Sequence, residues 1–406
     1  MPSICLYVQV HQPWRLRRCS FFRPTSDHTC FDDELNGAIF RSVAERCYLP
    51  ANRLMRRLIE EHGGAFRFAC SISGTALQQM EQFSPETLAS FVDLVRTGCV
   101  ELLGETSHHS LAALYDEREF HEEVRLHREL IRRHFGVTPQ VFRNTELIYS
   151  DEIARMIAPL GYQAILAEGA DDILAGRSPN RVYRVPGSAV ALLTRNYHRS
   201  DDIAFRFSDP TGERAPLTAE RLSRRLLQEG GRDAVVNLFL DYETFGEHHR
   251  ASSGIFDLLV GLPGRVIGKG GARFLTPTEV VKEHDVVEPL SVPRVTSWAD
   301  EDRAVTAWRG NRMQRSALQQ IFELGPSVRW RQNPVALETW RRLLTSDHFY
   351  YMSTKANADG EVHAYFRPYE SPYEAFINYM NVLRDFRASW LGLPATPDRE
   401  LLAAGA

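Results

Sequence analysis

Residues 234–249 read Ala-Val-Val-Asn-Leu-Phe-Leu-Asp-Tyr-Glu-Thr-Phe-Gly-Glu-His-His, an apolar run that ends in the carboxylate of Asp241. Such a run is typical of a buried strand that stops at the following turn. A second segment repeats the pattern, because residues 139–142 (Pro-Gln-Val-Phe) are followed by Arg-Asn-Thr and then Glu146. In parallel α/β proteins, ligands bind where the carboxyl ends of the strands meet. We therefore expect Glu146 and Asp241 to face one cleft.

Two further strand-like runs also end in polar residues. Residues 4–10 lead into His-Gln-Pro-Trp at 11–14, and residues 100–106 lead into Ser-His-His-Ser at 107–110. Paired carboxylates among such side chains are the chemistry of glycoside hydrolysis. Two alternatives stay open: each acid could cap a helix or meet a basic side chain, and the His and Asp residues could bind zinc, as in deacetylases on similar barrels.

The chain alternates strands and helices up to about residue 285, which predicts an α/β fold. Strands are expected at residues 4–10, 66–71, 100–106, 139–142, 163–166, 189–193 and 234–241. Helices are expected at residues 43–61 (divided at Pro50), from residue 84, and at 117–134 and 151–160. Seven βα units indicate a closed or nearly closed parallel barrel over residues 1–285. Residues 286–406 show helical patterns at 301–324, 334–345 and 372–390, and we expect this C-terminal α-helical domain to complete the substrate cleft.

The charge, hydrophobic pattern and cysteine content of the chain limit the classes of protein to which it can belong. The chain has 406 residues and a net charge of −4, which gives no indication of nucleic acid as a partner. It contains no apolar run long enough to cross a membrane and no signal-peptide pattern at its start, so we expect a cytoplasmic enzyme. Its six cysteines include no Cys-x-x-Cys pair, which predicts reduced thiols and no metal cluster. We expect neither a metal nor a cofactor, and the sequence does not define the oligomeric state.

Five regions in chain order resemble the signature regions of glycoside hydrolase family 57. They begin at His11-Gln12-Pro13, Glu105, Phe142, Asp241 and Thr296, and the last runs through Trp298 and Asp300 to Asn311. Residues 346–352 and 368–373 resemble the α-amylase-type members. The second region departs from the pattern, because it carries His108-His109-Ser110 where several members have Glu-Pro or His-Pro at a substrate subsite.

The resemblance implies an incomplete (β/α)7 barrel and a retaining mechanism on α-1,4-glucans or malto-oligosaccharides. Glu146 matches the family's nucleophile, and Asp241 matches its acid/base. Hydrolysis as in α-amylases is the first expectation, and transfer by a 4-α-glucanotransferase or branching enzyme is the alternative. The expected substrate-binding residues are His11, Trp14, Glu105, His108, His109, Glu243, His248, Trp298, Asp300, Trp308 and Tyr350. Glu243 is also expected to raise the pKa of Asp241 by repulsion, since both side chains point to the same face of an extended segment.

Overall fold

The computed structural model describes residues 2–19, 30–207, 217–229, 231, 234–269, 271–355 and 367–392. The chain forms two compact units. The first comprises Met1–Gln12, Gly37–Ser107 and Glu117–Ala299, and the second comprises Pro13–Asn36, His108–Asp116 and Asp300–Ala406.

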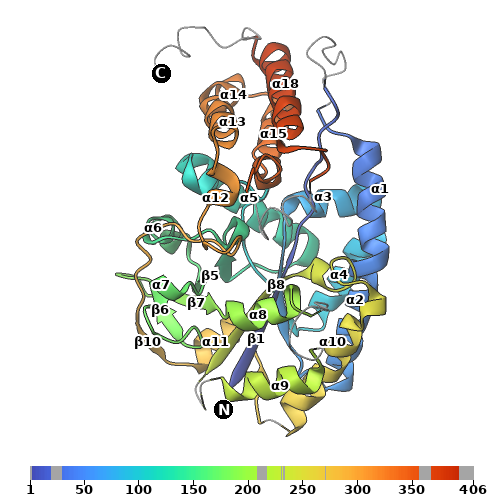
Figure 1. The fold of residues 1–406 in the computed structure, drawn as a ribbon, viewed down its shortest axis with the longest axis vertical. Coiled ribbons are helices and arrows are strands. Elements are labelled where there is room, and N and C mark those ends of the chain that lie inside the picture. Colours follow the sequence, from blue (N-terminus) through green and yellow to red (C-terminus); the bar gives the residue numbers. More distant parts are fainter. Residues whose placement is uncertain are drawn as a thin grey trace. The chain divides into compact units, whose positions relative to one another are not determined.

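The first unit is built on seven parallel strands, and Figure 1 shows β1 beside β8 among the surrounding helices. The seven strands are β1 (Ser3–Val10), β2 (Phe68–Ile72), β3 (Val100–Leu102), β4 (Val141–Arg143), β5 (Ala164–Glu168), β7 (Ala191–Arg195) and β8 (Val235–Asp241). Hydrogen bonds join these strands in two separate ladders, one in the order β3-β2-β1-β8 and the other in the order β7-β5-β4.

Main-chain hydrogen bonds close both seams between the two ladders. Gly104 donates to the Val141 carbonyl at 2.9 Å, which joins the segment after β3 to β4. Asn196 donates to the Asn237 carbonyl at 2.9 Å, which joins the segment after β7 to β8. The predicted seven-stranded parallel barrel is therefore confirmed. Gly104 is required at its seam, because a Cβ there would lie 2.5 Å from the Tyr162 hydroxyl.

Three short strands were not predicted. They are β6 (Val182–Arg184), which runs antiparallel to β7, β9 (Arg273–Phe274), which pairs with β1, and β10 (Val286–Pro289), which pairs with β6. Each has two to four residues. Runs this short carry too little periodicity to be recognised in a sequence.

Helices connect the strands. They are α1 (Asp33–Val43), α2 (Leu49–Glu61), α3 (Gly74–Phe83), α4 (Pro85–Arg96), α5 (Glu117–Phe135), α6 (Asp151–Ile157), α7 (Asp171–Leu174), α8 (Tyr197–Ala204), α9 (Ala219–Gln228), α10 (Ile255–Gly264) and α11 (Pro277–Glu283). The predicted division at Pro50 is confirmed, since α2 begins at Leu49 and a π-helical segment, Ala44–Tyr48, precedes it. Pro50 lies in the first turn, where a helix needs no N–H from it.

Alternation along each strand separates two hydrophobic cores. On β1, Ile4, Leu6 and Val8 pack with the core that the helices share, whereas Cys5 and Tyr7 belong to the core inside the barrel. That inner core also includes Ala69, Leu103, Val141, Ala164, Leu166, Ala191, Leu193, Val235 and Phe239. Side chains two residues apart on a strand share a face, so the residue two positions beyond the last inner-core residue of each strand also points inward. All of these residues are polar. These positions are Gln9, Ser71, Glu105, Arg143, Glu168, Arg195 and Asp241. The barrel interior therefore changes from apolar to charged toward the carboxyl ends of its strands.

The second unit is helical. Its helices after residue 300 are α12 (Thr306–Arg309), α13 (Arg312–Glu323), α14 (Gly325–Arg331), α15 (Pro334–Leu343), α16 (Ser346–Tyr350) and α18 (Pro372–Leu391). Buried Trp340 donates from its indole to the Ile321 carbonyl at 2.9 Å, and buried Tyr379 donates to the Leu343 carbonyl at 2.9 Å. These bonds satisfy the polar atoms of large core side chains and fix the helices against one another. No helix in the described ranges combines the length and apolar character needed to cross a bilayer.

Candidate active site

Glu146 lies just beyond β4 in a strained turn. Its backbone is left-handed (φ 55°, ψ 28°), and the next residue, Leu147, also has a positive φ of 50°. Such a conformation costs a residue other than glycine about 1–3 kcal/mol and is concentrated at functional sites. The turn leaves the Glu146 side chain half-buried, whereas its neighbours Thr145 and Leu147 are buried.

A segment close to the end of the first unit holds Glu146 in this turn. The indole Nε1 of Trp298 donates to Glu146 Oε2 at 2.7 Å. The Ser297 hydroxyl donates to the Glu146 carbonyl oxygen at 2.8 Å, and the Trp298 N–H donates to the same oxygen at 3.3 Å. The side chain and the main chain of Glu146 are therefore both fixed, and the bond from the indole favours the ionised carboxylate.

Asp241 is the last residue of β8, where it pairs in register with Gln9 of β1. Its half-buried side chain follows Phe239 on the inward face of the strand. Glu146 and Asp241 thus come from strand ends of one barrel.

Glu243 is the most strongly perturbed carboxyl group after β8. It is buried, and the Tyr48 hydroxyl donates a short hydrogen bond to its Oε1. Burial raises the pKa of Glu243 to about 8, and the charge of Asp241 adds to the rise. The charge of Asp241 thus acts on Glu243, and the expected rise in the pKa of Asp241 stays a prediction.

Glu105 lies in a buried network on the inward face. It is fully buried, and Gln9 donates to both of its carboxylate oxygens at 3.3 and 3.4 Å. The guanidinium of Arg143, also fully buried, approaches Glu105 Oε2 to 4.0 Å, and His127 Nε2 approaches Oε1 to 3.9 Å. Burial of an anion requires compensating positive charge, which Arg143 supplies, because burial lowers the pKa of His127 and favours its neutral form.

Arg195 holds a second buried charge cluster. Its guanidinium donates to Glu168 at 3.1 Å and to Asp201 at 2.6 Å, while its Nε donates to the Phe239 carbonyl at 2.9 Å. Arg195 is 3% exposed, so this cluster is also enclosed by protein.

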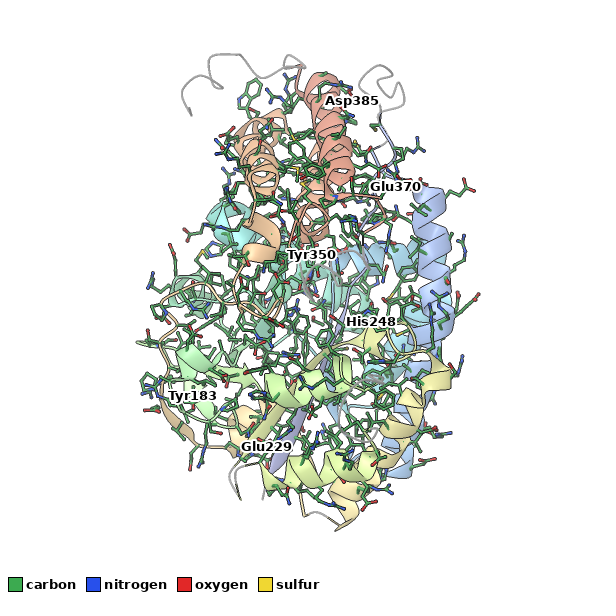
Figure 2. All side chains as sticks on the ribbon, in the orientation of Figure 1. Tyr183, Glu229, His248, Tyr350, Glu370 and Asp385 are labelled. Carbon is green, nitrogen blue, oxygen red and sulfur yellow. The ribbon has the colours of Figure 1, made fainter. Side chains whose placement is uncertain are left out.

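His11 and His248 lie after β1 and β8. His11 is half-buried and shares a hydrogen bond of 2.8 Å between its Nδ1 and the Ser73 hydroxyl. Burial lowers the pKa of His248 (Figure 2) to about 4. A neutral imidazole at His248 can both donate and accept a hydrogen bond near neutral pH, as a sugar hydroxyl requires.

The other predicted binding residues belong to the second unit. Trp14 is buried under the guanidinium of Arg342, 4.3 Å from its ring centroid, and Trp308 is buried beside Tyr350. Buried His108 pairs through Nε2 with Glu338 at 3.2 Å, and Asp300 pairs with Lys355 at 2.5 Å. His109 has a left-handed backbone (φ 51°), and its carbonyl accepts a bond from Ser346 at 3.0 Å. The substrate-binding roles expected for these residues stay predictions.

The sequence interpretation missed the inward-facing polar residues that surround the acids. They are Gln9, Ser71, Glu168 and Arg195, and the buried Tyr48 that donates to Glu243 was missed as well, whereas Arg143 was expected to help keep Glu146 ionised by its opposite charge. A signal was present, because most of them lie two residues beyond an inner-core position on a strand. Within the described ranges, no group of three or more His, Cys, Asp or Glu side chains is arranged to hold a metal ion, and no disulfide joins any of the cysteines there.

Comparison with known proteins identifies the family of the chain. The family model described as glycosyl hydrolase family 57 matches residues 5–293. A Methanocaldococcus jannaschii protein named "Putative alpha-amylase" is 39% identical over 398 residues, which cover 94% of this chain and 84% of that protein.

Solved structures share the fold at low identity. A family 57 branching enzyme from Thermococcus kodakaraensis superposes with a TM-score of 0.68 at 14% identity, over 99% of this chain and 93% of that one. The 4-α-glucanotransferase from Thermococcus litoralis superposes with a TM-score of 0.64 at 12% identity, over 95% of this chain. The chain spans 58% of the length of that glucanotransferase. The family match and the similar relative establish that this chain belongs to glycosyl hydrolase family 57.

Proposed function

We propose that this protein is a retaining enzyme that cleaves α-1,4-glucans, with Glu146 as the nucleophile and Asp241 as the acid/base. The observation that carries the proposal is the pair of carboxylates at the ends of β4 and β8, of which Glu146 is held by the Trp298 indole. An α-glucan is the substrate class because the similar Methanocaldococcus jannaschii protein is named as an α-amylase.

The reaction divides into two displacements. In the first, a carboxylate oxygen of Glu146 attacks the anomeric carbon, the glycosidic C–O bond breaks, and the leaving oxygen takes the proton of Asp241. In the second, a water oxygen attacks the same carbon and gives its proton to the Asp241 carboxylate. The glycosyl ester bond breaks, and Glu146 is released as a carboxylate. A sugar hydroxyl in place of water gives transfer instead of hydrolysis.

The surroundings of the two acids fit these roles. A nucleophile must be ionised, and the 2.7 Å bond from the Trp298 indole favours that form of Glu146. An acid must hold a proton; burial and the charge of Asp241 keep a proton on the neighbouring Glu243, and protonation of Asp241 itself before the first displacement stays a prediction. A neutral His248 can donate and accept hydrogen bonds near neutral pH, as contact with a sugar hydroxyl requires. A cytoplasmic location and the placement of the helical domain at the substrate cleft stay predictions.

Product analysis on maltoheptaose and amylose tests the proposal. We expect only shorter oligosaccharides, each released first as the α-anomer. Longer products would favour a 4-α-glucanotransferase, and new α-1,6 linkages would favour a branching enzyme. Absence of turnover on either glucan, or first release of the β-anomer, would contradict the proposal.

A further inference from the structure

Trp298 was expected to bind the substrate, but its contacts point to another role. Its ring is approached by the guanidinium of Arg143, 4.7 Å from the ring centroid, and by that of Arg195, 5.6 Å away. Both distances are in the range of cation–π contacts. A sugar could stack on the face that Arg143 covers only after displacing a fully buried cation.

The two arginines come from the barrel. Arg195, the last residue of β7, is anchored by Glu168 and Asp201, whereas Arg143, the last residue of β4, is fully buried and approaches Glu105 Oε2 to 4.0 Å. The orientation of the Trp298 ring is therefore set by side chains from two strand ends.

The polar edge of the same ring is directed at Glu146. An indole has one N–H donor and no acceptor, so its bond to Glu146 Oε2 is available only while that oxygen can accept. The adjacent Ser297 and the Trp298 main chain hold the Glu146 carbonyl, which secures the left-handed turn that presents the carboxylate. Three bonds from two consecutive residues thus converge on one acid.

The geometry points to Trp298 as a positioning residue for the nucleophile: it keeps Glu146 ionised and oriented, and Arg143 and Arg195 keep the indole in place. This inference rests on the proposed function, since it requires Glu146 to attack the substrate. The hydrogen bond from the indole is in place before the reaction. It favours the ionised form of Glu146 and limits rotation of the carboxylate away from the anomeric carbon.

The test is Trp298→Phe, which retains an aromatic ring for the arginines and removes the N–H donor. We expect kcat on maltoheptaose to fall about 10- to 100-fold, with KM changed less than about threefold, because one charge-assisted hydrogen bond is lost. We also expect the acidic limb of the kcat/KM profile to move to higher pH by about one unit, since the ionised form of Glu146 loses a donor. Trp330→Phe is the matched control, because Trp330 is 81% exposed on α14, and it should leave all three parameters unchanged.

Each rival account gives a different result. A sugar platform predicts a raised KM with little loss of kcat at saturation, and a purely structural role predicts a lower Tm with an unchanged acidic limb. Either result would overturn the inference. If the Phe variant fails to fold, Trp298→Leu, which also removes the N–H donor, is measured for the same displacement of the acidic limb relative to the wild-type enzyme, and an unmoved limb overturns the inference. If the proposed function is wrong, the wild-type enzyme itself will show no turnover of maltoheptaose. That result distinguishes a failure of the proposed function from a failure of this inference.

Discussion

Replacement of Glu243 by glutamine should change how the stability of the protein depends on pH. Burial and the charge of Asp241 raise the pKa of Glu243 from 4.5 to about 8. Between these two values the folded protein retains a proton that the unfolded chain has released, so stability falls as pH rises through this window. At 1.36 kcal/mol per pKa unit, the loss reaches about 5 kcal/mol at pH 8. A glutamine side chain is neutral at every pH and keeps an oxygen that can accept the bond from Tyr48.

Thermal unfolding measured from pH 4 to pH 9, which spans both pKa values, gives the test. With an unfolding entropy of roughly 2.1 cal/mol/K per residue, a loss of about 5 kcal/mol corresponds to a fall in Tm of about 6 °C across the 406-residue chain. We expect Glu243→Gln to remove most of this fall relative to the wild type. Glu60→Gln is the matched control, because the Glu60 side chain is 61% exposed beside Arg56, and its profile should follow the wild type. A Glu243→Gln profile that falls as steeply as the wild type would refute a protonated, buried Glu243.

Three further outcomes are expected. Glu146→Gln and Asp241→Asn should each lower kcat on maltoheptaose at least about a thousandfold, with Tm within a few degrees of the wild type. Near-normal turnover by either purified variant would show that the replaced residue takes no part in the reaction. Activity should survive exhaustive dialysis against EDTA, because a retaining mechanism needs only two carboxyl groups; loss of turnover that zinc restores would favour metal chemistry. Arg195→Met should destabilise the protein by about 3–5 kcal/mol in denaturant unfolding, because Glu168 and Asp201 would remain buried without their cation; a change below about 1 kcal/mol would contradict that ion pairing.

The barrel could be predicted because its strands carry strong local signals. Each of the seven is a short apolar run bounded by turn residues, and the alternation with helices then limits the topology. The ends of β4 and β8 could also be located, which was enough to select Glu146 and Asp241. Strands β6, β9 and β10 could not be located, since strands of two to four residues gain their stability from their partner strands and not from their own pattern.

The surroundings of the two acids were harder to predict because they depend on tertiary geometry. No local pattern indicates that the Trp298 indole bonds to Glu146, 152 residues earlier in the chain. Likewise, the spacing of Asp241 and Glu243 indicated mutual repulsion, but the burial that contributes most to the raised pKa of Glu243 depends on the tertiary structure. The left-handed backbone at Glu146 is maintained by bonds from Ser297 and Trp298, and its sequence, Thr-Glu-Leu, would not by itself favour it.

The central claim is that Glu146 forms a covalent bond to the sugar, and trapping that ester tests it most directly. A 5-fluoroglycosyl fluoride of α configuration reacts with the nucleophile of a retaining α-enzyme and leaves a slowly hydrolysed adduct that peptide mapping by mass spectrometry can locate. We predict one fluoroglycosyl group per chain, on the peptide that contains Glu146, and no label in Glu146→Gln. A label on Asp241, Glu243 or any residue other than Glu146 would contradict the assignment.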